Sequence, residues 1–312
     1  MNHTNYEWVD EWVTIPDSPM GRTNGITHGV AVSATGYVFV FHQASPSVLV
    51  FNSDGQLLDA WGDFPGAHGM SLVIQEGKEF LWLTDQDSAR VVKTTLDGKT
   101  MMELPSPDHV LYSQDNKYIP TWASQHPDTG EVWVADGYGA YLVHRYDSHG
   151  NYQSSIDGSE GAGRFCEPHG LAFTRGSDGV ELFITDRSNH RIAVYDDQGN
   201  FLRSSLSAHS PCSFDFLNNQ VVVPELFTGV KLLEKNNLEL ITEIGANELV
   251  GPRPDGGWWP PAAPEGWPNL AGTPLIRPGR FNSPHAACFA PNGDIYVVEW
   301  IIGGRITKLV RK

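Results

Sequence analysis

The sequence has few cysteines, few basic residues and no long apolar run. Three cysteines among 312 residues are too few for a disulfide framework. With 21 basic against 37 acidic residues, the net charge of −16 argues against a nucleic-acid or anionic-membrane partner. No run reaches membrane-spanning length, and the polar, acidic segment 1–12 does not resemble a secretion signal. We therefore expect a cytoplasmic protein that binds neither nucleic acid nor a membrane.

What the chain does contain favours many short strands. It carries 32 glycines and 21 prolines, more than a helical protein would have, and 40% of its residues are apolar. Between residues 28 and 61 we predict four strands, near 28–33, 37–42, 47–51 and 56–61. Gly36 and Asp54-Gly55 would supply turns between them. The composition predicts an all-β fold.

A motif in which a histidine precedes an apolar run, a turn and a second apolar run recurs along the chain. The longest match is Gly-Arg-Phe-x-x-Pro-His, at 163–169 and again at 279–285. Six units of about 40 residues begin as follows: His28, His68, Thr121, His169, near Cys212, and His285. Units of this length with four strands each predict a six-bladed β-propeller. A β-sandwich, the alternative, does not repeat a histidine-led motif.

The ends of the chain complete this prediction. The sixth unit runs out at Lys312 after three strands, and the alternating segment 6–14 resembles the missing fourth. We expect residues 1–312 to form a single propeller domain, closed by pairing of the N-terminal strand with the last blade. An irregular insertion at about 247–278 carries three tryptophans among prolines and glycines. It is interpreted as a loop packed on the blades, a subunit contact that would allow an oligomer, or a lid.

The histidines at the starts of the second, fourth and sixth units are candidate metal ligands. Equivalent starts on alternate blades would direct His68, His169 and His285 toward one cation and leave a coordination position open. The alternative is that these histidines only satisfy hydrogen bonds around the tunnel. His28 has the same position in the first blade, as a further ligand, an acid/base group or a metal-free lining residue. At the same position in the third and fifth blades, Trp122 would wall the pocket and Cys212 would be a small core residue.

A second series lies at the ends of the second strands. Its members are His42, Asp85, Asp136, Asp186, Glu225 and Glu299. We expect most of them to tie turns together by hydrogen bonds, although some could orient the histidines. The residues just after two of them, Tyr138 and Arg187, are candidates for a general base and a charge-stabilising cation. Ordinary aromatic packing and a salt bridge are the alternative roles.

From about His28 onward, the repeats resemble those of NHL-type propellers and, among these, the peptidyl-α-hydroxyglycine α-amidating lyases. The matching stretches are His68-Gly69-Met70-Ser71, Ala135-Asp136-Gly137-Tyr138, Pro168-His169-Gly170-Leu171, Asp186-Arg187-Ser188-Asn189-His190-Arg191-Ile192 and Pro284-His285. The resemblance implies a zinc ion on His68, His169 and His285, with Tyr138 catalytic and Arg187 in the active site. It also implies cleavage of a hydroxylated C-terminal glycine into an amide and glyoxylate.

Two positions depart from that family. Gln43 follows Phe41-His42 where the family has an arginine, and Ala286 stands where it has an aspartate associated with a structural calcium. The first departure favours a neutral hydroxylated or carbonyl-bearing substrate, such as a modified sugar, and the second argues against the calcium. Substrate contacts are expected from His42, Gln43 and Trp122.

Three functions therefore remain open. The first is a metal-dependent lyase that cleaves a carbon–heteroatom bond. The second is a lactonase-like hydrolase, although such enzymes bind their ion through carboxylates and asparagine. The third is a binding scaffold without chemistry.

Overall fold

The protein is built from six antiparallel four-stranded sheets, the fold class of a six-bladed β-propeller. The computed structural model describes residues 5–113, 116–247 and 276–312. Within these ranges the helices are two three-residue 3-10 turns, η1 (Met20–Arg22) and η2 (Arg187–Asn189). None of the helices in these ranges is long and apolar enough to cross a membrane. The prediction of an all-β, six-bladed propeller is confirmed.

Backbone contacts divide the chain into two compact units, one formed by residues 61–213 and the other by 1–60 together with 214–312. The first unit holds three sheets, in which consecutive strands are hydrogen-bonded neighbours. They are β6 (Ala67–Gln75), β7 (Lys78–Asp85), β8 (Arg90–Thr95) and β9 (Thr100–Leu104); β10 (Trp122–Gln125), β11 (Val132–Asp136), β12 (Leu142–Tyr146) and β13 (Tyr152–Ile156); and β14 (Pro168–Arg175), β15 (Val180–Asp186), β16 (Arg191–Asp196) and β17 (Phe201–Ser205).

The second unit holds the other three sheets. They are β2 (Thr27–Val32), β3 (Val38–His42), β4 (Val48–Phe51) and β5 (Leu57–Trp61); β18 (Asp215–Leu217), β19 (Gln220–Pro224), β20 (Val230–Glu234) and β21 (Leu240–Ile244); and β22 (Pro284–Phe289), β23 (Ile295–Glu299) and β24 (Arg305–Arg311) with β1 (Tyr6–Val13). The strands predicted in the first repeat agree with β2 to β5 to within a residue or so at each end. Gly36 and Gly55 adopt positive φ angles of 85° and 86° at the predicted turns.

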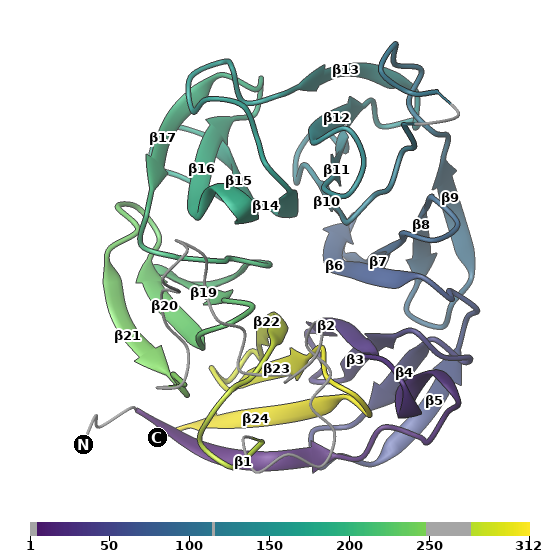
Figure 1. The fold of residues 1–312 in the computed structure, drawn as a ribbon, viewed down its shortest axis with the longest axis vertical. Helices are drawn as coiled ribbons and strands as arrows, with labels where there is room; N and C mark the ends of the chain where they lie inside the picture. Colours follow the sequence, from purple (N-terminus) through teal and green to yellow (C-terminus); the bar gives the residue numbers. More distant parts are fainter. Residues whose placement is uncertain (1–4, 114–115, 248–275) are drawn as a thin grey trace. The chain divides into compact units, whose positions relative to one another are not determined.

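The N-terminal strand completes the last sheet, as predicted. β1 pairs antiparallel with β24, with Tyr6 opposite Arg311 and Trp8 opposite Leu309. Figure 1 shows this pairing as a purple strand alongside a yellow one. The sheet therefore joins residues from opposite ends of the chain, and β1 covers the outer edge of β24.

The fifth sheet differs from the prediction at its start. Cys212 lies outside the strands, and the first strand of that sheet, β18, has only three residues beginning at Asp215. Cys212 itself is fully buried, which confirms its expected role as a core residue. The interpretations of the insertion concern residues 248–275, which lie outside the described residues.

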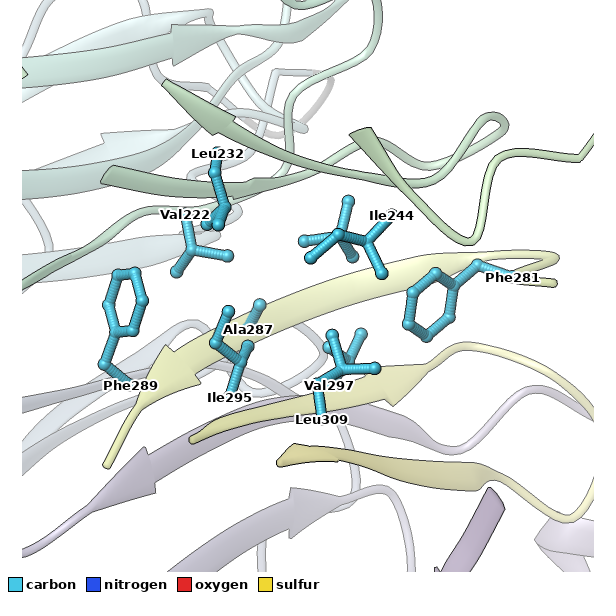
Figure 2. Packing of buried hydrophobic residues seen from close by; sticks show 10 residues of the cluster. Val222, Leu232, Ile244, Phe281, Ala287, Phe289, Ile295, Val297 and Leu309 are labelled. Atoms are coloured by element: carbon cyan, nitrogen blue, oxygen red, sulfur yellow. The ribbon is translucent and has the colours of Figure 1, made fainter. Parts of the chain in front are cut away.

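Apolar side chains fill the space between neighbouring sheets. Figure 2 shows Val222, Leu232 and Ile244 of the fifth sheet facing Ala287 of the sixth sheet and Phe281, which precedes that sheet. A similar cluster joins the sheets that begin with β6 and β10, where Trp82 is 1% exposed. Complete burial of a valine, leucine, isoleucine or phenylalanine side chain stabilises the folded state by roughly 1.5–3 kcal/mol. In β22, β23 and β11 every residue is buried, so these strands contribute side chains to the packing on both of their faces.

Candidate metal centre

The candidate site in residues 61–213 is built on two equivalent histidines. His68 is the second residue of β6 and His169 the second residue of β14, and both are almost completely buried. In both strands the pairing register shifts at the histidine, between Ala67 and Met70 and between Pro168 and Leu171. Such an irregularity re-aims a side chain that a regular strand would direct into a sheet face. The two rings come to lie 4.7 Å apart, measured between centroids.

The residues after the histidines hold this irregular backbone. The N–H of Gly69 donates to Thr84 Oγ1 at 2.7 Å, and that of Gly170 donates to Thr185 Oγ1 at 2.6 Å. Both threonines immediately precede an aspartate at the end of the second strand. The pairing of His-Gly with a later Thr-Asp is therefore a sequence signal for this geometry, and sequence reasoning missed it.

Each predicted ligand has its ring oriented by a backbone carbonyl. Nδ1 lies 2.8 Å from the Thr121 oxygen in His68 and 2.7 Å from the Cys212 oxygen in His169. In His285, Nδ1 lies 2.8 Å from the His28 oxygen. A carbonyl oxygen only accepts, so Nδ1 carries the proton and donates it, and Nε2 presents its lone pair. This is the tautomer that a metal ligand bound through Nε2 requires.

Carbonyls, rather than the acidic series, therefore orient the histidines. The acids hold turns, as expected: Asp85 accepts from the backbone of Asp87 and Ser88, and Asp186 accepts from the N–H of Cys166 at 2.7 Å.

Tyr138 lies next to both predicted metal ligands of this unit. Its hydroxyl oxygen is 3.1 Å from Nε2 of His68 and 3.1 Å from Nε2 of His169. A tyrosine hydroxyl has a single proton and can donate to only one of these nitrogens. The other oxygen–nitrogen contact would bring two lone pairs together unless a proton or a cation lies there. Two buried imidazole lone pairs beside a phenol oxygen thus fit a divalent metal of the zinc type.

Arg187 completes the group from η2. Its guanidinium donates to the Tyr138 oxygen at 3.0 Å and lies 5.3 Å from the centroid of the Tyr138 ring. Its Nε is 3.4 Å from the carboxylate of Glu167. Burial raises the pKa of the Tyr138 hydroxyl, and the charge of Arg187 opposes that rise. The structure thus brings together four of the predicted site residues: His68, Tyr138, His169 and Arg187.

Other predicted residues lie in the second unit. The ring centroids of His28 and His285 are 4.7 Å apart, and the ring centroid of Trp300 lies 5.9 Å from that of His28. His28, like His68 and His285, offers a buried ring nitrogen that a metal could use.

The residues predicted to contact substrate are all buried. His42 makes a hydrogen bond through Nε2 to the Pro46 oxygen at 2.8 Å, so part of its polar capacity holds the turn after β3. Gln43 is 6% exposed, and its N–H donates to the Ile26 oxygen. Trp122, in the first unit, is 3% exposed and begins β10. Their roles toward a substrate stay predictions.

Comparisons with known proteins show what the chain resembles. No protein-family profile matches the chain. NHL repeat-containing protein 3 of Homo sapiens is 30% identical over 193 residues, covering 57% of this chain and 54% of that protein. The chain resembles the NHL-type propellers. A probable peptidyl-alpha-hydroxyglycine alpha-amidating lyase of Caenorhabditis elegans is 21% identical over 217 residues, covering 58% of this chain and 57% of that protein.

The chain spans little more than half the length of the curated relatives it matches. Among solved structures, a streptogramin B lyase superimposes with a TM-score of 0.61 at 14% identity and covers 98% of both chains. That likeness supports the propeller fold. One of these curated relatives is thus a probable lyase by name, and this solved structure is also named a lyase.

Proposed function

We propose that this NHL-type propeller is a metal-dependent lyase that cleaves a carbon–heteroatom bond in a small, neutral, hydroxylated or carbonyl-bearing substrate. The observation that carries the proposal is the Tyr138 hydroxyl, 3.1 Å from Nε2 of both His68 and His169 and 3.0 Å from the Arg187 guanidinium. A buried phenol between two imidazoles and a cation is suited to moving a proton. The similarity to a probable amidating lyase supports the same reaction class.

His68 and His169 would hold the metal, with His285 as third ligand because it repeats their position in the sequence and their Nδ1 hydrogen bond. When bound, a zinc-like ion supplies positive charge that polarises a substrate oxygen and lowers the pKa of the neighbouring phenol. His28 is a further ligand or acid/base candidate. Because Ala286 follows His285, we do not include a structural calcium.

The chain's own residues account for the proton movement. In a substrate with a nitrogen and a hydroxyl on one carbon, Tyr138 in its deprotonated form would take the hydroxyl proton as the carbon–oxygen double bond forms and the carbon–nitrogen bond breaks. The same proton then passes to the departing nitrogen, so that an amide or amine and a carbonyl compound result with no other reactant. Arg187 donates to the Tyr138 oxygen at 3.0 Å and would stabilise its anion during the transfer.

Metal analysis of the purified protein tests the first part of the proposal. We expect close to one zinc or similar divalent ion per chain, most of it lost in His169→Ala while the far-UV circular dichroism spectrum is unchanged. His149→Ala is the matched control, because His149 is an exposed histidine on the turn between β12 and β13. Metal retained in a triple His68, His169 and His285 to Ala variant would disprove the ligand set, and a wild-type protein without metal would favour a binding scaffold.

Turnover tests the second part. Gln43 cannot pair with a carboxylate as an arginine would, so a peptidyl-α-hydroxyglycine should be a poor substrate. Glyoxylate release at about 10⁴ M⁻¹s⁻¹ or more would instead indicate the amidating-lyase substrate. Tyr138→Phe should abolish turnover of the true substrate without releasing the metal. Hydrolysis of a lactone in place of carbon–heteroatom elimination would favour the hydrolase.

A further inference from the structure

The turn that carries Tyr138 is held differently from the corresponding turns in three of the other sheets. In those three, the acid at the end of the second strand or directly after it forms an ion pair with a basic residue of the third strand. These pairs are Asp186–Arg191, Glu225–Lys231 and Glu299–Arg305. In the sheet of Tyr138 the acid is Asp136, and the residue opposite it is the apolar Leu142. Among the described residues, no basic side chain forms an ion pair with Asp136.

A tyrosine and a histidine take the place of that cation. The Tyr112 hydroxyl donates to Asp136 Oδ2 at 2.8 Å and lies 2.6 Å from Nε2 of His144. Tyr112 belongs to the connection between β9 and β10, whereas His144 is a buried residue of β12. The group therefore ties a connecting segment, a strand and a carboxylate together at one point.

Every proton in this group can be assigned. Because Tyr112 gives its proton to Asp136, the contact with His144 requires Nε2–H to donate to the Tyr112 oxygen. Nδ1 of His144 then accepts from Ser155 Oγ at 2.7 Å, and Ser155 accepts from the Tyr152 hydroxyl at 2.8 Å. Burial lowers the pKa of His144 to about 3, in keeping with a neutral ring. The result is one directed chain of hydrogen bonds that ends on Asp136.

The carboxylate of Asp136 in turn sets the backbone around Tyr138. It accepts from the N–H of Ile119 at 2.7 Å and from the N–H of Ala140 at 2.5 Å. A β-carbon on Gly139 would lie 2.2 Å from Asp136 Oδ1, so the backbone can approach the carboxylate closely only because residue 139 is glycine. A rotated carboxylate would release both N–H groups and displace the turn that carries Tyr138.

We infer that Tyr112 and His144 are positioning residues, which orient Asp136 and thereby hold the Tyr138 hydroxyl between His68 and His169. Their effect on turnover rests on the proposed function, whereas their effect on the place of Tyr138 does not. The two residues touch neither the reacting group nor the proposed ligands. Their substitution should alter the surroundings of Tyr138 and leave the metal-binding histidines present.

The test observes Tyr138 directly by NMR in full-length protein labelled at Cζ of its ten tyrosines. The Tyr138 resonance is the one that disappears in Tyr138→Phe. We expect it to shift or broaden in Tyr112→Phe and in His144→Leu, and to return toward its original position in His144→Gln, whose amide N–H can replace Nε2–H. Tyr195→Phe is the matched control, because the buried Tyr195 hydroxyl has no hydrogen-bond partner within the described part of the chain.

A Tyr138 resonance unchanged in both Tyr112→Phe and His144→Leu would overturn the inference. If Tyr112→Phe does not fold, Ser155→Ala breaks the same chain of hydrogen bonds between Tyr152 and His144 and should move the resonance in the same direction. Where a substrate is available, Tyr112→Phe should lower kcat about tenfold to a hundredfold with KM little changed. A responsive resonance in a protein without metal or turnover would uphold the positioning role and refute the proposed function.

Discussion

A β-carbon on Gly69 would lie 2.3 Å from the carbonyl oxygen of Thr121, the same oxygen that accepts the hydrogen bond from His68 Nδ1. Likewise, a β-carbon on Gly170 would lie 2.4 Å from the carbonyl oxygen of Cys212, which accepts the hydrogen bond from His169 Nδ1. The glycine after each histidine thus permits the strand of one sheet to approach the next closely enough for the ring to reach a carbonyl. The absence of a side chain at one residue sets the orientation of its neighbour.

This relationship makes Gly69→Ala a test of the histidine geometry. The added methyl group must push β6 away from β10 and lengthen the His68 hydrogen bond, so we expect a loss of metal together with a lower unfolding midpoint. Gly77→Ala is the control in the same unit. Its φ of 73° costs about 1 kcal/mol for a side chain, but a β-carbon there meets nothing within 4 Å. Equal metal contents in the two variants would contradict the role assigned to the close approach.

The buried hydroxyl of Thr84 should matter for stability. It accepts from Gly69 N–H at 2.7 Å and can donate to the Thr121 oxygen at 2.9 Å. Thr84→Val keeps the shape but leaves that N–H without its acceptor, which should cost about 1–3 kcal/mol in urea unfolding. Thr94→Val removes an equally buried hydroxyl that has no partner within the described residues, so it should be neutral or slightly stabilising. A similar cost for both variants would count against the role of Thr84.

Removal of the N-terminal strand should expose the edge of the last sheet. Without residues 1–13, β24 would keep β23 but lose β1, its neighbour on the other side, and Phe281 would lose the ring of Trp8, whose centroid lies 4.5 Å away. We expect the truncated protein to aggregate or to melt at a much lower temperature, as followed by size-exclusion chromatography and calorimetry. Glu7→Ala, which changes an exposed residue of the same strand, should behave like the parent. A monodisperse truncated protein of unchanged stability would show that β1 is dispensable.

Asp215 should make stability depend on pH. Burial raises its pKa from 3.8 to about 6, although its carboxylate accepts from the N–H of Phe289 at 2.7 Å. Between about pH 4 and pH 6 the folded protein therefore binds more protons at this site than the unfolded chain. The contribution of Asp215 to the free energy of unfolding should therefore fall as pH rises through that window, by about 2–3 kcal/mol.

Asp215→Asn removes this titration and retains a carbonyl acceptor for the Phe289 N–H. As pH rises from 4 to 7, the parent should therefore lose stability relative to the variant. Above pH 7 the difference between their free energies of unfolding should stay constant. Denaturant titrations at several pH values measure the difference while cancelling the titration of all other groups. A difference that does not change with pH would refute the raised pKa.

Much of the fold could be predicted because strand periodicity and repetition are local properties. Alternating apolar residues identified β1, and the recurrence of a histidine before an apolar run identified β6, β14 and β22. The start of the fifth sheet was less predictable, because Cys212 has no histidine motif and β18 has only three residues. A strand that short offers too few residues for a periodic signal.

The amino-acid sequence alone determined the six strand-rich units, the closing strand and the identity of His68, Tyr138, His169 and Arg187 as candidates. Only the tertiary structure decided how those side chains meet. The register shifts that turn the histidines depend on pairing with the next strand of the same sheet. The carbonyls that accept from Nδ1 and the hydroxyl 3.1 Å from two Nε2 atoms join residues more than thirty positions apart. Tyr112 and His144, likewise 32 positions apart, carried no motif at all. Their contact exists because packing of neighbouring sheets sets distances of a few ångströms, which no local pattern of residue types encodes.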